Sequence, residues 1–192
     1  HELNSKVAKL ISEGNVIGWF QGRSEFGPRA LGNRSILADP RNINMQKKLN
    51  LKIKYREGFR PFAPSVLEED YKLFFEGDLE TPYMLLVKNV AKSTLKSIPN
   101  NYNDLNYWDK LYTLRSSLQS ITHVDFSARI QTVSKKTNLK YWSLINEFKK
   151  ITGIGVLINT SFNVRGEPIV NSPEDAFKCF MNTEMDFMVI EN

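Results

Sequence analysis

The apolar residues of the chain occur in short runs, and this limits the possible fold more than any other feature of the sequence. Residues 84–87 and 154–158 form runs of strand length, far shorter than a membrane span. Residues 139–151 instead space their apolar side chains as a helix does. Because strands and helices alternate but the loops between them are long, we expect an α/β or α+β fold with a mixed sheet.

The same patterns predict the individual elements. Residues 21–31, rich in glycine, proline and charge, are expected to form a loop, and residues 92–119 a long loop or insertion. Ser172 is expected to cap a final helix, because Pro173 and acidic residues follow it. Strands are expected at 15–20, 35–38, 65–67, 82–90, 126–133, 154–158 and 187–190, and further helices at 3–13, 42–51, 70–75 and 139–151.

Size and composition exclude several classes of protein. With 192 residues, 41% of them hydrophobic and 24% charged, the chain can bury the core of one globular domain. Its one cysteine, Cys179, rules out an internal disulfide and a multi-cysteine zinc site. The first residues lack the basic-then-apolar pattern of a secretory signal. We therefore expect one domain in the cytoplasm, without a membrane partner.

Positive charge is concentrated in one segment. Residues 21–60 contain ten Lys or Arg against three acidic residues, a net charge of +7, whereas the rest of the chain sums to −2. A solvated surface usually mixes both signs, so this segment predicts an anionic partner, such as phosphates, a nucleotide or a nucleic acid.

The first candidate site is the loop at residues 22–35. Its glycines allow the backbone to approach a ligand closely, and the planar guanidinium groups of Arg23, Arg29 and Arg34 can each pair bidentately with phosphate oxygens. The alternative is a solvated loop with surface arginines.

Residues 52–62 form a second basic block. If this block is extended, Lys52, Lys54 and Arg56 share one face. A basic surface strand would show the same pattern. Arg60 lies between aromatic residues and proline, so we expect it in a partly apolar wall, where it needs a counter-charge.

A third block, residues 159–168, directly follows an apolar strand. Ligands of open α/β sheets gather at the carboxyl ends of strands, and the side chains of Asn159, Ser161, Asn163 and Arg165 can bind a nucleotide or phosphate. The same residues also make a good turn.

The fourth block surrounds His123. On a strand, the side chains of His123, Asp125, Ser127 and Arg129 would share one face. The spacing of His123 and Asp125 does not match a catalytic triad, so Arg129 is the better site candidate. The sequence has no Walker A motif, no GxGxxG at a strand–helix junction and no CxxC. Phosphate would therefore be bound by arginines and polar turns.

Taken together and in order, these blocks resemble the carbamoyltransferase family. Its members include nodulation-factor carbamoyltransferases and the enzymes that carbamoylate tobramycin and cephamycins. The resemblance runs from about Gly14 to the C-terminus, and residues 92–119 contain none of its motifs. The matching segments are FGPRALGNRS within residues 18–37, RPFAPS at 60–65, THVD and ARIQTV within 122–133, and NTSFN and GEPI within 159–169.

The resemblance implies a fold and a reaction. Residues 1–192 would form the family's C-terminal domain, with a YrdC/Sua5-like twisted mixed sheet flanked by helices. This domain resembles a site where ATP and carbamoyl phosphate yield carbamoyl adenylate. A separate N-terminal domain, similar to Kae1 and expected to hold Fe²⁺, would transfer the carbamoyl group to an acceptor hydroxyl. We expect that domain to be absent from this chain, which would leave only the adenylate-forming half reaction.

The resemblance also assigns roles to residues. Lys54, Arg60 and Arg129 are implied as catalytic. ATP and carbamoyl phosphate bring roughly six negative charges, so a cluster of cations is required. Mg²⁺ would accompany the triphosphate without a metal site of the protein's own. The implied binding residues for ATP and carbamoyl phosphate are Arg29, Arg34, Lys54, Arg60, Arg129, Asn159 and Ser161, with weaker claims for Arg23, Asn163 and Arg165.

Two other functions compete with this one. A stand-alone threonylcarbamoyl-adenylate synthase would need groups for threonine and bicarbonate, and the long FGPRALG block argues against it. A nucleic-acid-binding module would need exposed aromatic residues among the charges. Phe26, Phe59 and Phe62 instead lie beside glycine and proline, which favours a pocket wall. A purely structural domain would leave the polar blocks unexplained.

Overall fold

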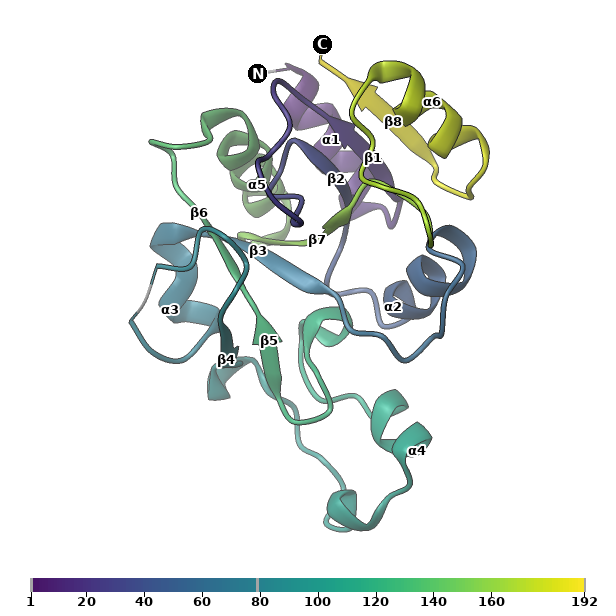
Figure 1. The fold of residues 1–192 in the computed structure, drawn as a ribbon. Helices are drawn as coiled ribbons and strands as arrows, with labels where there is room; N and C mark the ends of the chain where they lie inside the picture. The colour runs from purple at the N-terminus through teal and green to yellow at the C-terminus, as the bar shows by residue number, and fades with distance from the viewer. Residues whose placement is uncertain (1, 79, 192) are drawn as a thin grey trace.

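A six-stranded mixed sheet forms the centre of the protein (Figure 1). The computed structural model describes residues 2–78 and 80–191. The strand order is β6-β3-β7-β2-β1-β8, in which β1–β8 and β3–β6 are parallel pairs and the other neighbours are antiparallel. The six strands are β1 (Ile17–Phe20), β2 (Arg34–Ala38), β3 (Ala63–Leu67), β6 (Gln131–Val133), β7 (Val156–Ser161) and β8 (Phe187–Ile190).

Helices cover both faces of this sheet. On one face, α1 (Glu2–Ser12) packs with α5 (Leu139–Thr152) over the side chains of Ile17 and Trp19. On the other face, Val16 and Phe20 join a second apolar cluster, because successive side chains of a strand alternate between faces. That cluster also receives side chains from α2 (Met45–Lys48) with the π-helical turn that follows it (Leu49–Ile53), from α3 (Tyr71–Phe74) and from α6 (Pro173–Met181).

Local sequence explains where the long helices begin and end. The side chain of Asn138 accepts a hydrogen bond from the Tyr141 N–H at the start of α5, and Gly153 ends that helix with a φ of 77°. At α6, the Ser172 side chain accepts from the Asp175 N–H while the Asp175 carboxylate accepts from the Ser172 N–H. The cap predicted at Ser172 is therefore confirmed.

Three predicted elements differ from the structure. Of residues 82–90, only β4 (Val87–Asn89) is a strand, because Met84, with a φ of 55°, departs from extended backbone. Met84 is buried, whereas Leu85 and Leu86 are exposed. The strand predicted at 126–133 breaks at Ile130 into β5 (Ser127–Arg129) and β6, which pair with β4 and β3 respectively.

The third difference concerns the basic block. The helix predicted at 42–51 begins at Met45 and continues through the π-helical turn to Ile53. Lys52 therefore lies on a helical turn, where its ammonium pairs with Glu184 at 2.7 Å. The shared strand face predicted for Lys52, Lys54 and Arg56 does not exist.

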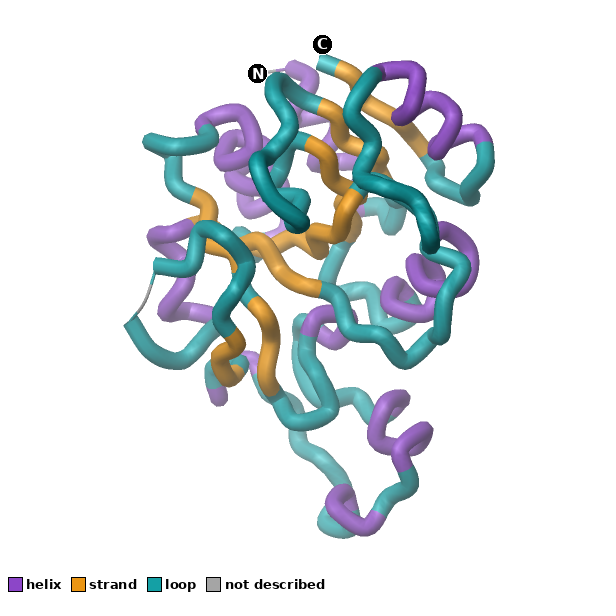
Figure 2. Tube along the Cα trace, viewed as in Figure 1, coloured by secondary structure: helices purple, strands orange, loops and turns teal. Residues whose placement is uncertain are grey.

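Residues 92–119 form an irregular arm that extends away from the sheet (Figure 1). Figure 2 shows the arm as mostly loop with short helical segments, among them α4 (Tyr107–Tyr112). The prediction of a long irregular insertion is confirmed, although α4 itself was not predicted. None of the helices within the described residues combines the length and the apolar composition that a membrane span requires.

Candidate functional site

Two adjoining cavities lie beside the carboxyl end of β7. One, of about 130 Å³, is lined by Arg29, Arg129 and Asn159, together with apolar groups that include Phe62 and Met84. The other, of about 220 Å³, is lined by Lys54, Arg60, Asn163 and Arg165. Arg56 and Ser161 line both cavities, so the two are neighbours, and together they are called here the arginine pocket.

The first cavity of the arginine pocket concentrates positive charge, since Arg29, Arg56 and Arg129 line it and no described acidic residue does. The second cavity has Glu167 in its lining. Among the described residues, none of Arg29, Arg56 and Arg129 forms an ion pair with an acidic side chain. The buried Nε atoms of Arg29 and Arg129 also have no hydrogen-bond partner. Burial lowers the pKa of Arg129 and the neighbouring charge of Arg29 adds to this, while burial and Arg60 lower that of Arg56. An anion between these groups would relieve both the repulsion and the unmet hydrogen bonds.

Lys54 is the buried cation of the pocket. Its ammonium donates to the carbonyl of Asn163 at 2.9 Å and to the Asn163 Oδ1 at 2.7 Å, and it also reaches the carbonyl and Oγ of Ser161. Burial lowers the pKa of Lys54 from 10.5 to about 7, and the charge of Arg56 contributes in the same direction. Lys54 therefore fixes the turn after β7 and can gain or lose a proton near neutral pH.

Asn159 connects the sheet to the loop between β1 and β2, called here the arginine loop. Its Nδ2 donates to the Ala30 carbonyl at 3.2 Å, to Ser65 Oγ at 3.0 Å and to Gln131 Oε1 at 2.9 Å. Gln131 in turn donates to the Leu31 carbonyl at 2.8 Å. The buried Oδ1 of Asn159 has no partner, and the residue lines the cavity. This network holds the backbone at Ala30 and Leu31, directly after Arg29, in a fixed position.

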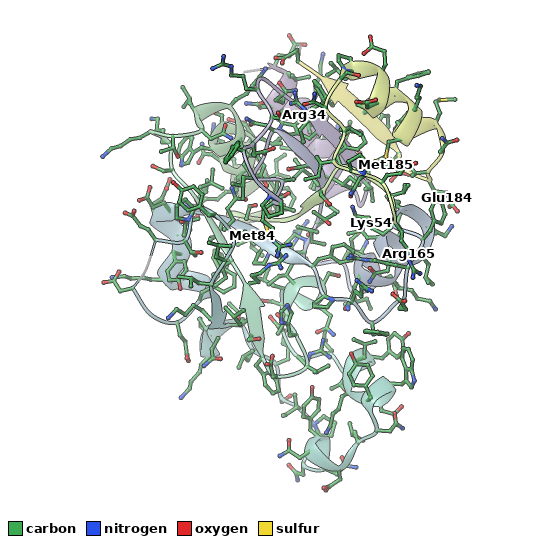
Figure 3. The ribbon with its side chains drawn as sticks, viewed as in Figure 1. Arg34, Lys54, Met84, Arg165, Glu184 and Met185 are labelled. Atoms are coloured by element: carbon green, nitrogen blue, oxygen red, sulfur yellow. The ribbon has the colours of Figure 1, made fainter. Side chains whose placement is uncertain are left out.

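The loop between β1 and β2 is fixed from within. One carboxylate oxygen of Glu25 accepts from the N–H groups of Leu31 and Asn33, both at 2.7 Å. The guanidinium of Arg34 stacks on the Phe20 ring and donates to the carbonyls of Gln21, Gly22 and Asn33. Arg34, predicted as a substrate ligand, is thus buried within the loop's own hydrogen bonds, and Figure 3 shows it well apart from Lys54 and Arg165.

The remaining predicted cations lie at the rim or outside. Arg60 is exposed, and Glu57 accepts from its Nε at 3.0 Å, so the expected counter-charge is present but the expected apolar wall is not. Arg165 is also exposed, at 3.8 Å from the Glu57 carboxylate. Arg23 is exposed in its loop and lines neither cavity of the arginine pocket.

The aromatic residues and the His123 block also require correction. Of the three phenylalanines expected in a pocket wall, only Phe62 is buried there, whereas Phe26 and Phe59 are exposed. His123 and Asp125 belong to a turn before β5 and contact Ser127 Oγ at 3.3 and 2.7 Å, so no common strand face with Arg129 exists.

Sequence reasoning missed the central position of Arg56. Its membership in the basic block was noted, but it was not selected as a ligand, and it lines both cavities. The available signal was its place in the basic block, because the strand face on which it would have joined Lys54 does not exist. The site assignments of Arg29, Lys54, Arg129, Asn159 and Ser161 stay predictions, although the structure brings all five together. Among the described residues, no group of three or more His, Cys, Asp and Glu side chains could hold a metal ion.

Solved structures establish the class of fold. The chain is similar to P. abyssi Sua5 in complex with L-threonine, with a TM-score of 0.61 and 12% identity over 98% of this chain and 46% of that one. It is also similar to full-length HypF in its phosphate- and nucleotide-bound form, with a TM-score of 0.58 and 17% identity over 98% of this chain and 25% of that one. The protein therefore has a YrdC/Sua5-like fold, as predicted.

Sequence comparison establishes the family. The family model described as "Carbamoyltransferase C-terminus" matches residues 8–192, and the chain belongs to this family. It is 48% identical to nodulation protein NolNO of Sinorhizobium fredii, over 98% of this chain and 25% of that protein. It is 38% identical to the 3'-hydroxymethylcephem-O-carbamoyltransferase of Amycolatopsis lactamdurans, over 90% of this chain and 29% of that protein.

A third relative is an uncharacterised protein of Synechocystis. It is 58% identical over 100% of this chain and 31% of its own length. The chain thus spans less than a third of each of these three curated relatives.

Proposed function

We propose that the arginine pocket binds ATP and carbamoyl phosphate and forms carbamoyl adenylate. A transferase region outside residues 1–192 would then pass the carbamoyl group to an acceptor hydroxyl. The observation that carries this proposal is the group of Arg29, Arg56 and Arg129 around one cavity, without carboxylate partners among the described residues. Such a group is suited to two phosphorylated substrates, whose combined charge must be neutralised before they can react.

The proposed reaction consists of two balanced steps. In the first step, water attacks the carbonyl carbon of carbamoyl phosphate. The single bond between this carbon and the oxygen that bridges to phosphorus breaks, and the products are carbamate and inorganic phosphate. A carbamate oxygen then attacks the α-phosphorus of ATP, and pyrophosphate leaves with the bonding electron pair. The products are carbamoyl adenylate and pyrophosphate. Because the attacking oxygen is already anionic, the second step needs no general base.

The residues of the pocket would contribute mainly by positioning and electrostatics. Arg29, Arg56 and Arg129 would pair with phosphate oxygens and stabilise the charge that develops as pyrophosphate leaves. Lys54 would hold the turn after β7 and carry a proton when the anion is bound. Mg²⁺ supplies further charge neutralisation when it is bound with the triphosphate. Its ligands would be mostly phosphates and water, since the described residues offer no acidic cluster.

The comparisons support this proposal at a coarser level. The Amycolatopsis relative is a 3'-hydroxymethylcephem-O-carbamoyltransferase by name, and HypF, which shares the fold, has been seen with phosphate and a nucleotide bound. These properties belong to those proteins. Together with the arginine pocket they favour a carbamoyl-activating site over a general anion site.

The Arg129→Ala variant tests the site directly. We expect it to weaken ATP binding by more than tenfold, on the order of 1.5–3 kcal/mol, because a charge-assisted bond is lost. Isothermal titration of ATP with Mg²⁺ measures this affinity. The matched control is Lys72→Ala, which removes an exposed cation that pairs with Asp78 and lies in neither cavity. Equal ATP affinity in the wild type and in Arg129→Ala, with both proteins folded by circular dichroism, would overturn the assignment.

The likeness to Sua5 bound to L-threonine keeps a second function open. A threonylcarbamoyl-adenylate synthase would form its adenylate from threonine, bicarbonate and ATP. The two functions differ in their substrates, so mass spectrometry after incubation with each set separates them. Threonylcarbamoyl adenylate as the only adduct would favour the Sua5-like function.

A further inference from the structure

The arm at residues 92–119 presents a cluster of aromatic side chains that the arginine pocket does not use. The rings of Tyr107 and Trp108 lie 5.9 Å apart, and those of Trp108 and Tyr112 lie 6.4 Å apart and are stacked. Phe59, from the basic block, meets Tyr107 at 6.0 Å and Trp108 at 6.4 Å. All four rings are exposed. We call Phe59, Tyr107, Trp108 and Tyr112 the aromatic ridge.

Hydrogen bonds of one buried arginine anchor the arm that carries the ridge. Arg115 is fully buried, and its guanidinium donates to the carbonyls of Leu111, Thr113 and Thr122 at 2.9–3.1 Å. The Asn106 side chain caps α4 by accepting from the Asp109 N–H at 3.0 Å. A buried guanidinium is costly unless its donors are satisfied, and here its hydrogen bonds tie the backbone of the arm to Thr122 at the arm's base.

Two hollows of about 260 and 250 Å³ adjoin the ridge and share Gln46 and Leu111. Tyr112 lines the first hollow, and Tyr107 and Phe59 line the second. Pro61 lines both the second hollow and the arginine pocket, so the ridge and the reactive site are neighbours on the surface. Pre-ordered aromatic side chains beside hollows are typical of the centre of a protein–protein interface.

We propose that the aromatic ridge and its two hollows are the docking surface for the transferase region of the same longer polypeptide. This inference rests on the proposed function, which places that region outside residues 1–192. Curated relatives matched over 90–100% of this chain are more than three times its length, so in them a large further region is joined to this domain and is available to dock on it.

The chemistry of the intermediate favours this position for the contact. Carbamoyl adenylate is a mixed anhydride that water cleaves, so it must be transferred without release into solvent. A protein surface seated on the ridge would lie next to the mouth of the arginine pocket and would limit the entry of water. The arginine pocket binds ATP and carbamoyl phosphate. The arm at 92–119 lines no part of that pocket and instead positions the transferase region that binds the acceptor.

Site-specific photocrosslinking in the full-length polypeptide tests this proposal. Tyr112, which is 62% exposed in the domain, is replaced by the photoreactive amino acid p-benzoylphenylalanine. Phe177 on α6, which is 54% exposed and distant in sequence from the ridge, receives the same replacement as the matched control. Both positions are exposed, so the replacement does not disturb a core. Peptide mass spectrometry then identifies the linked segments.

We expect light to link position 112 to a peptide outside residues 1–192 of the same polypeptide, and position 177 to give at least tenfold less of that product. Absence of the link, or a product of doubled mass that joins two copies, would overturn the proposal. The test needs neither ATP nor an acceptor. If the crosslink forms but the protein makes no carbamoyl adenylate, the docking surface is supported and the proposed function is wrong. If carbamoyl adenylate forms without the crosslink, the proposed function is supported and the docking surface is wrong.

Discussion

At the residue scale, the charge of the Lys54 ammonium makes ligand binding in the arginine pocket depend on pH. Its pKa of about 7 in the unliganded protein results from burial and from the charge of Arg56. A bound anion favours the charged form and must raise this pKa, so binding takes up a proton when the pH lies above 7. Affinity for a phosphate ligand should accordingly fall as the pH rises above 7, by up to about tenfold per pH unit.

Calorimetry can measure this proton uptake. ATP is titrated at pH 8 in buffers of different ionisation enthalpy, and we expect uptake approaching about one proton per site. The Lys54→Met variant keeps the apolar stem of the side chain and should lose the uptake. Binding by the wild type that is independent of buffer would show that Lys54 does not titrate with the ligand.

Individual residues also mark how far the sequence could predict the site. Arg29 and Arg34 belong to one block and have equal claims as phosphate ligands by sequence. Only the fold separates them, because the Arg34 side chain turns inward to three carbonyls while Arg29 faces the cavity. A sequence shows which residue types are concentrated in a loop, but the direction of each side chain depends on backbone turns formed by distant partners such as Gln131 and Asn159.

At the scale of elements, two glycines with positive φ shape the arginine loop, and only one of them is also packed tightly. Gly32 has a φ of +115°, and a Cβ there would overlap the ring of Tyr141 on α5. Gly27, in the same loop, has a φ of +127° but open space around it. A side chain would therefore strain the backbone at both Gly27 and Gly32, but it would collide with a neighbouring side chain only at Gly32.

Gly27→Ala is expected to reduce the free energy of unfolding by about 1–3 kcal/mol through backbone strain. Gly32→Ala should cost about 1–3 kcal/mol more, because the alanine Cβ displaces the Tyr141 ring, and it should also weaken ATP binding by moving Arg29. Urea unfolding followed by circular dichroism measures both variants. Equal losses in the two would show that the contact with Tyr141 does not matter.

The elements predicted well are those with a strong local pattern. Both α5 and α6 have amphipathic spacing and capping residues, and the structure contains them nearly as expected. The strand expected at 82–90 was mostly wrong because an apolar run indicates burial, whereas Leu85 and Leu86 are exposed and the buried Met84 lines the arginine pocket. The break at Ile130 was also not readable, since it exists only because β5 and β6 pair with different strands.

For the molecule as a whole, the sheet topology explains why distant blocks form one site. The central strand β7 lies between β2 and β3, so the loop before β2, the segment before β3 and the turn after β7 all reach the same end of the sheet. Order and composition alone indicated a mixed sheet and an anionic ligand. Strand order decides which blocks meet. The family resemblance implied that these blocks share one site, which the periodicity of the sequence cannot show.

The proposed activation of carbamoyl phosphate with ATP has one product, carbamoyl adenylate, that can be detected directly. The most direct test is to incubate the protein with ATP, Mg²⁺ and carbamoyl phosphate and to search for carbamoyl adenylate by mass spectrometry, with release of pyrophosphate measured in parallel. We predict that adduct and pyrophosphate appear together, depend on carbamoyl phosphate, and are lost in Arg129→Ala. Tight binding of ATP and carbamoyl phosphate without adduct or pyrophosphate would contradict the account.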